Sequence, residues 1–251
     1  MTYCVGIKVK EGVVALADGR ITAGTQVTSA RKTAMFGDAA TEIVIMTSGL
    51  RSLRDKTFAY LRRAMQERGS PHGSMFEAVM EYSKCLRAVA EEEREALARG
   101  NLFFNLHALV CGQLPLDTEP TVYLVYPEGS WLEVDSRTPY LSIGETTYGK
   151  PILDRALSYG TSLRNAVKLA YLSFDSTRIS AADVGFPIDI LTYGRAERRW
   201  REAHFDYDDM VRQRQWWNSN LMELAARMPD DQWSETLFPA NPLSVVATEK
   251  K

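Results

Sequence analysis

The strongest constraint on the fold lies in the first eighteen residues, where two apolar runs are separated by a short polar stretch. Residues 3–10, YCVGIKVK, alternate large apolar side chains with small or polar ones, which is the period-two pattern of a strand. Glu11-Gly12 follows as a turn signal, and residues 13–17, VVALA, form a second apolar run. The pattern predicts a β-hairpin at the extreme N-terminus.

Further extended segments are predicted at residues 43–47, 106–111, 121–126, 140–143 and 188–193. Amphipathic helices are predicted over 75–89 and 163–174, where apolar residues recur every three or four positions, and from about 48–52 to Gln66. Because strands and helices do not alternate strictly, the order favours an α+β domain in which antiparallel sheets pack together and helices cover the outside.

Composition excludes several classes of protein. The 251 residues are 45% hydrophobic and carry 30 basic against 32 acidic residues, for a net charge of −2. This balance argues against a nucleic-acid partner. No stretch has the length of a membrane span or the pattern of a secretion signal, so a cytoplasmic location is expected. The odd number of widely spaced cysteines, Cys4, Cys85 and Cys111, predicts reduced and buried thiols.

A change of composition near residue 195 suggests a domain boundary. Four of the five tryptophans follow it, and apolar residues there are spaced to line one side of a long helix: Val211, Trp216, Leu221, Leu224 and Met228. We therefore expect a core domain over residues 1–194. Residues 195–251 are expected to form a helical extension that packs on the core or on a neighbouring subunit.

Thr2 is a candidate nucleophile. Threonine is small enough for an initiator Met to be removed in front of it, which would leave a free α-amine with a pKa near 7.7 to 8.0. Such an amine can accept the proton of the neighbouring hydroxyl, so that nucleophile and base belong to one residue. The site also needs a cation that keeps the amine neutral, for which Lys32 is the candidate, and an anion that orients this cation, for which Asp18 is the candidate.

These residues stand in an order that resembles a known family. Thr2, the stretch LADGRITAG with Asp18, then Lys32, then TSG at 47–49 before a helix resemble a proteasome-type N-terminal-nucleophile hydrolase. The segments SIGETTYGKPILDRAL from Ser142, SFDSTRIS from Ser173 and VGFPIDILTY from Val184 resemble the bacterial ancestral β-subunit (Anbu) group within it. The resemblance covers residues 2 to 194.

The resemblance implies a four-layer αββα sandwich of two antiparallel sheets, with Thr2 at the mouth of the cleft between them. It further implies that the Gly49 backbone N–H faces the developing oxyanion. Arg20, Thr22 and Ser48 are expected to bind substrate, Thr22 at a place where extended peptide backbone is held.

Two positions depart from the family pattern. Gly144-Glu145-Thr146 stands where many proteasome subunits have a Gly-Ser-Gly turn, and Val184 stands where they carry a second serine. Ser142 is expected to compensate from nearby.

The function predicted from these residues is threonine-type peptide-bond hydrolysis within a homo-oligomer, either a ring or an open spiral. The expected substrates are peptides or unfolded proteins. No cofactor and no metal are expected, because the three histidines lack ligand spacing. No P-loop motif is present, so an ATP-driven unfoldase would be a partner. Two alternatives stay open: an amidase of the same superfamily acting on a small amide, and a non-catalytic oligomeric scaffold.

Overall fold

The computed structural model describes residues 2–23, 25–38 and 41–238. The chain forms two compact units, Met1–Asp209 and Met210–Lys251. The first unit extends past the boundary expected at residue 194, because the strand β12 (Arg199–Phe205) pairs along its whole length with β11 (Ile188–Gly194). This strand is mostly exposed and polar, so it lacks the alternating apolar pattern by which strands are predicted.

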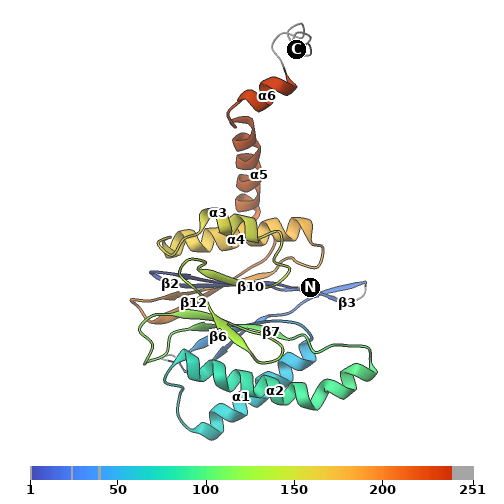
Figure 1. Cartoon of the computed structure of the whole chain (residues 1–251), viewed down its shortest axis with the longest axis vertical. Coiled ribbons are helices and arrows are strands. Elements are labelled where there is room, and N and C mark those ends of the chain that lie inside the picture. Colours follow the sequence, from blue (N-terminus) through green and yellow to red (C-terminus); the bar gives the residue numbers. More distant parts are fainter. Residues whose placement is uncertain (1, 24, 39–40, 239–251) are drawn as a thin grey trace, which may run out of the picture. The chain divides into compact units, whose positions relative to one another are not determined.

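Two five-stranded sheets make up the centre of the first unit (Figure 1). The first has the order β10-β1-β2-β11-β12, in which β1 is Tyr3–Val9, β2 is Gly12–Asp18 and β10 is Tyr140–Gly144. The second has the order β5-β6-β7-β8-β9; its strands are Thr33–Phe36, Ile43–Ser48, His107–Gly112, Thr121–Val125 and Trp131–Glu133. All pairings are antiparallel. A separate two-stranded ribbon joins β3 (Arg20–Ala23) to β4 (Gln26–Ser29).

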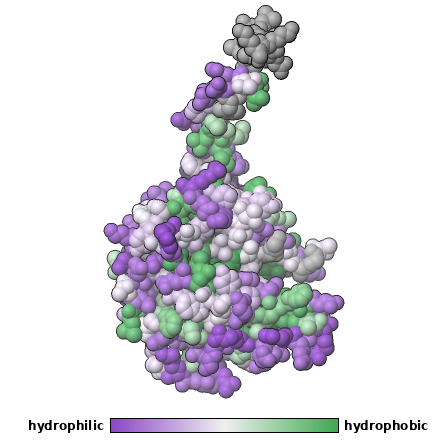
Figure 2. Space-filling view, viewed as in Figure 1, coloured by the Kyte–Doolittle hydropathy of each residue, from purple (hydrophilic) through white to green (hydrophobic). Residues whose placement is uncertain are grey.

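Helices cover the outer face of each sheet (Figure 1). The helices α1 (Arg51–Arg68) and α2 (Met75–Arg99) share an apolar core with the second sheet, and α4 (Leu163–Ser180), next to α3 (Lys150–Ala156), packs on β1 and β2. On the face drawn in Figure 2, hydrophilic residues cover most of the layer that α1 and α2 form. The predicted four-layer αββα sandwich is thereby confirmed.

The N-terminal hairpin forms as predicted, although its turn is Lys10-Glu11 because Gly12 already pairs with Val9. Every residue of β1 and β2 is buried, since each face of these strands meets another layer. The Tyr3 hydroxyl is hydrogen-bonded to Ser173 on α4, whereas Cys4 belongs to the apolar core between the sheets. The hairpin is thus the centre of the sandwich.

The second unit contains α5 (Val211–Ala226) and α6 (Gln232–Leu237). A helix was predicted here, and α5 confirms it. Trp216, Leu221 and Leu224 are all exposed in the single chain. That this segment packs on the core or on a neighbouring subunit stays a prediction.

Cys4, Cys85 and Cys111 are free thiols and buried, as predicted. Among the residues that the structure describes, no helix combines the length and apolar character needed to cross a membrane.

Close approach of the two sheets leads to a test at Gly6. A Cβ added there would lie 2.7 Å from Cγ1 of Val122 and 3.2 Å from Sγ of Cys111, and a β-branched neighbour in a close-packed interface has little freedom to move. We expect Gly6→Ala to lower the free energy of unfolding by about 1–3 kcal/mol, measured by urea denaturation.

Gly160→Ala is the matched control. A Cβ at Gly160 meets nothing nearer than Oγ of Ser158 at 3.9 Å, so the free energy of unfolding should change by about 0.5 kcal/mol or less. Equal stabilities of the two variants would contradict the tight packing of the sheets at Gly6.

Candidate active site

Asp18 ends β2 inside the protein and is fully buried. Its Oδ1 accepts hydrogen bonds from the backbone N–H of Tyr3 at 2.8 Å and from Nζ of Lys32 at 2.6 Å. Its Oδ2 accepts from the backbone N–H of Gly185 at 3.3 Å. The carboxylate therefore joins the residue after Thr2, the segment that carries Lys32 and the loop before β11.

The Asp18–Lys32 pair is an ion pair removed from water, since both side chains are less than a tenth exposed. Burial raises the pKa of Asp18 above its ordinary value, and the ammonium of Lys32 opposes that rise. Burial likewise raises the pKa of the neighbouring Cys4 thiol, so this cysteine is an uncharged member of the core. Lys32 is the cation of this cluster, and Asp18 orients it.

The start of β1 is held by β10 on its other side. Thr2, itself buried, accepts a hydrogen bond at its carbonyl oxygen from the Glu145 N–H at 2.7 Å. Gly144 precedes this contact with φ +87°, and a Cβ there would lie 1.9 Å from the Thr2 oxygen. Only glycine therefore fits at residue 144, and Glu145 serves through its backbone.

Gly185 is a site residue that the sequence analysis did not assign, although it lies in the VGFPIDILTY segment. Its N–H supports Asp18, and a Cβ at this position would come 2.5 Å from Cζ of Arg20. The preceding Val184 is buried, and its side chain offers no hydrogen bond. A glycine followed by Phe-Pro before a strand was the available signal for a close backbone approach.

Gly49 follows β6 and precedes α1. It has φ +138°, and a Cβ there would lie 2.8 Å from the carbonyl oxygen of Asn105. Two residues earlier, the Thr47 N–H is 3.4 Å from the carbonyl oxygen of Lys32. The fold thus brings the segment before Gly49 against the segment that carries Lys32.

Ser142 is not brought together with this cluster. It pairs with Val5, three residues from Thr2. Its neighbours Leu141 and Ile143 pack into the core between the sheets. Because side chains alternate along a strand, Ser142 faces the helix side of the first sheet, away from the second sheet.

The three residues expected to bind substrate have different surroundings. The Thr22 hydroxyl donates to Asp183 at 2.7 Å, and this hydrogen bond lowers the pKa of that carboxyl. Arg20 donates from Nη1 to the carbonyl oxygen of Ala182 at 2.8 Å. Ser48 ends β6 opposite His107. Arg20 and Thr22 therefore fasten β3 to the loop that also supports Asp18.

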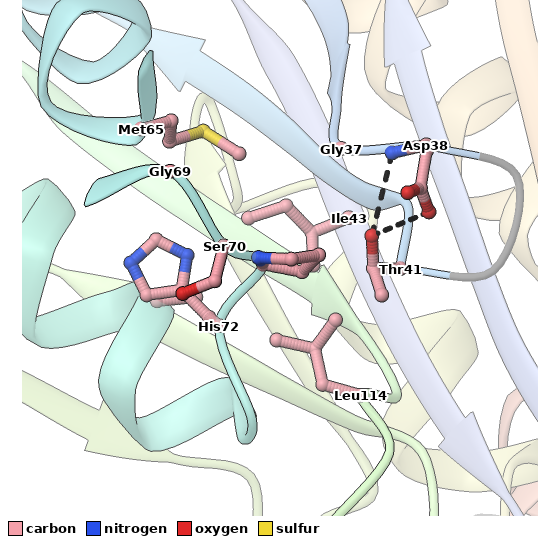
Figure 3. A pocket seen from close by; sticks show the side chains of 11 residues that line it. Gly37, Asp38, Thr41, Ile43, Met65, Gly69, Ser70, His72 and Leu114 are labelled. Carbon is pink, nitrogen blue, oxygen red and sulfur yellow. Dashed lines mark hydrogen bonds between the residues drawn. The ribbon is translucent and has the colours of Figure 1, made fainter. Parts of the chain in front are cut away.

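A pocket of about 240 Å³ lies elsewhere, between the α1–α2 connection and the loop before β6 (Figure 3). Ile43, which begins β6, lines it together with His72, whose Nε2 has no hydrogen-bond partner among the described residues. Gly49 lies beyond the other end of the same strand, so this pocket is separate from the Asp18–Lys32 cluster. Within the described ranges, no group of three or more His, Cys, Asp or Glu is placed to hold a metal ion.

Comparison with known proteins places this geometry in a family. The model of the proteasome subunit family matches residues 2–191. A structure of the helical assembly of the Anbu complex from Pseudomonas aeruginosa is 30% identical, with a TM-score of 0.84 over 91% of this chain and 98% of that one. A search of curated proteins finds no match.

Two other Anbu structures show the same backbone. Anbu (ancestral β-subunit) from Yersinia bercovieri is 28% identical, with a TM-score of 0.81 over 92% of this chain and 99% of that chain. An Anbu (Gly-1) mutant from Hyphomicrobium sp. strain MC1 is 26% identical, with a TM-score of 0.83 over the same shares. Since the family model and these backbones each match most of its length, the chain belongs to the proteasome subunit family and, within it, to the ancestral β-subunit group.

Proposed function

We propose that this protein is a threonine-type peptidase that acts within an assembly of identical subunits. In the proposed enzyme, removal of Met1 exposes the α-amine of Thr2. The observation that carries the proposal is the buried Asp18–Lys32 pair, whose carboxylate also binds the Tyr3 N–H. The Lys32 ammonium, which is removed from water, thus binds the same carboxylate oxygen as the N–H of Tyr3, the residue that follows Thr2.

The first half of the reaction forms an ester. The neutral α-amine of Thr2 accepts the proton of its own hydroxyl, and Oγ1 attacks the carbonyl carbon of the scissile peptide bond. The Lys32 ammonium lowers the pKa of the α-amine, which keeps a larger fraction of it neutral. As the C–N bond breaks, the protonated amine returns the proton to the leaving nitrogen, and the acyl group stays on Thr2 Oγ1.

The second half releases the acid. Water gives a proton to the same α-amine and attacks the ester carbon, and the bond to Thr2 Oγ1 breaks with return of that proton. In both halves negative charge develops on the carbonyl oxygen, and the backbone N–H of Gly49 is proposed to stabilise it.

Substrate is proposed to bind as an extended strand beside β3. In the described part of the chain, β3 pairs on one edge with β4 and has no strand on the other. An open edge of this kind offers backbone N–H and C=O groups to a peptide. The contacts of Arg20 and Thr22 with residues 182 and 183 would keep this edge in place.

Homo-oligomerisation is part of the proposal because a relative forms a helical assembly of the Anbu complex. We propose a ring or an open spiral here too, whose interior limits access to peptides or unfolded chains. A cytoplasmic location accords with the three free thiols.

One observation favours a second candidate function. Glu145 and Val184 stand where many proteasome subunits carry serines. Ser142, which was expected to compensate, faces the helix side of the first sheet, and the Val184 side chain cannot donate a hydrogen bond. A non-catalytic scaffold would tolerate such losses.

The small-amide alternative differs from the peptidase in length preference, which a comparison of short amides with longer peptides measures.

The peptidase proposal predicts that Thr2→Ala abolishes peptide cleavage, because the variant lacks the attacking oxygen. Mass spectrometry of the purified parent should find Met1 absent. It should also find an adduct on Thr2 after treatment with an electrophile that requires both a hydroxyl and a free α-amine.

Thr118→Ala, in an exposed loop, is the control and should cleave at the parental rate. Retained Met1, or a Thr2→Ala protein as active as the parent, would refute the peptidase and favour the scaffold.

The ion pair predicts an effect on stability that does not depend on activity. Lys32→Met leaves a buried carboxylate without its cation, so the free energy of unfolding should fall by about 3–5 kcal/mol. The double variant Asp18→Asn/Lys32→Met removes both charges and should lose less. Chemical denaturation of the parent, the single variant and the double variant provides the comparison.

The pH dependence of the Lys32→Met variant follows from the raised pKa of Asp18. An acid whose pKa is higher in the folded than in the unfolded state binds more protons when folded, so stability should increase as the pH falls from neutral toward the ordinary pKa of a carboxyl. The double variant should lack this increase. A flat profile for Lys32→Met would contradict the burial of an ionised Asp18.

A further inference from the structure

A cavity of about 340 Å³ lies between residues 30–34 and the first three turns of α1. Arginines dominate its lining, and Phe58, which is buried, supplies an apolar wall. The charged lining residues are Arg31, Arg51, Arg54, Asp55 and Arg62.

The charges in this cavity do not cancel. Asp55 is the single acidic lining residue, and it pairs with both Arg51, at 3.4 Å, and Arg54, at 2.6 Å. Arg62 lies with Cζ 5.3 Å from the centre of the Phe36 ring and contacts no carboxylate among the described residues. Two arginines therefore share one carboxylate and Arg62 adds a third positive charge, which leaves a positive surplus.

Arg31 does not add to this surplus. It forms an ion pair with Glu202 on β12 and lies 3.7 Å from the buried carboxylate of Asp189, so its charge is balanced outside the cavity. Its carbonyl oxygen accepts a hydrogen bond from Nη1 of Arg54 at 2.9 Å, which fixes α1 against the segment that carries Lys32.

The start of α1 adds to the positive potential. Its N-cap residue, Leu50, provides no side-chain hydrogen bond, and its first turn contains no acidic residue. The backbone N–H groups of that turn and the helix dipole therefore act in the same direction as Arg51 and Arg54.

Two short stretches of chain are shared by the cavity and the candidate active site. Arg31 and Thr33, which both line it, flank Lys32, and Arg51 follows Gly49 by two residues. The cavity, with a cationic rim and one apolar wall, is therefore built on the same chain segments as the candidate site, residues 31–33 and 49–51.

We propose that this cavity binds an acidic side chain of the substrate, aspartate or glutamate, and directs cleavage next to it. The cleavage part rests on the proposed peptidase function, whereas the binding part does not. The carboxylate would meet Arg51 and Arg62, and the methylene groups would contact Phe58.

Binding is tested on the Thr2→Ala protein, which cannot turn substrate over. The probes are two fluorescent peptides with both ends capped, identical except for one glutamate or glutamine, and fluorescence anisotropy measures their affinities. We expect the glutamate peptide to bind about ten-fold more tightly at low salt, with the preference falling as salt is added. Arg51→Gln/Arg62→Gln should abolish the preference.

Arg63→Gln is the matched control, because Arg63 is also exposed on the same helix but pairs with Glu67 outside the cavity. It should keep the parental preference. Thermal unfolding checks each variant, and Arg51→Gln alone replaces the double variant if loss of the Arg62–Phe36 contact unfolds it. Equal binding of the two peptides, or a preference that survives the arginine substitutions, overturns the proposed pocket.

The turnover arm separates this inference from the peptidase proposal. Protein with Thr2 intact should cleave the glutamate peptide faster, and the arginine variants should reduce that difference while still cleaving the glutamine peptide. Cleavage of both peptides at one rate defeats the acidic preference alone. Selective binding without any cleavage defeats the peptidase alone and leaves the acidic pocket in place.

Discussion

The Asp18–Lys32 ion pair is the interaction on which the arrangement of the site depends. It joins the end of β2, the N–H after Thr2, the loop before β11 and the segment before β5. Removing two charges from water costs free energy that their attraction repays only in good geometry. A pair held this deeply is therefore a poor means of stabilising a fold, whereas strongly perturbed groups of this kind are typical of functional sites. The hydrogen-bond geometry of the Asp18–Lys32 pair and its burial therefore both favour a functional role for it.

Local patterns predicted the centre of the fold because they reflect local physics. Apolar side chains alternate in residues 3–10 and recur every three or four positions in α2 and α4, and each pattern follows from the geometry of a single strand or helix. Strand β12 was missed because its side chains are mostly exposed and polar. The boundary expected at 194 followed from the change of composition there, which does not show that the next residues form a strand of the same sheet. The motif order pointed to Asp18 and Lys32, and the structure brings these two together.

Other parts of the site depend on tertiary contacts that no short segment encodes. Gly185 and Glu145 act through backbone N–H groups, which every residue except proline has, so only the glycine itself hinted at a close backbone approach at residue 185. The sequence shows that Ser142 lies on the opposite face of its strand from Leu141 and Ile143. Which face turns toward the helices becomes clear only from the packing of those two neighbours between the sheets. The arginine-lined cavity needs residues near 31 and along α1 to converge, which follows from the pairing of β5 with β6.

Strand β12 closes one edge of the first sheet with charged residues, among them Arg199, Arg201 and Glu202. Charged side chains on an edge strand oppose the addition of a strand from another molecule. Copies of this chain are thereby discouraged from joining by continuous sheet across that edge. At that edge, a contact between copies would have to use side chains, so its geometry would be determined by surface complementarity and not by backbone pairing.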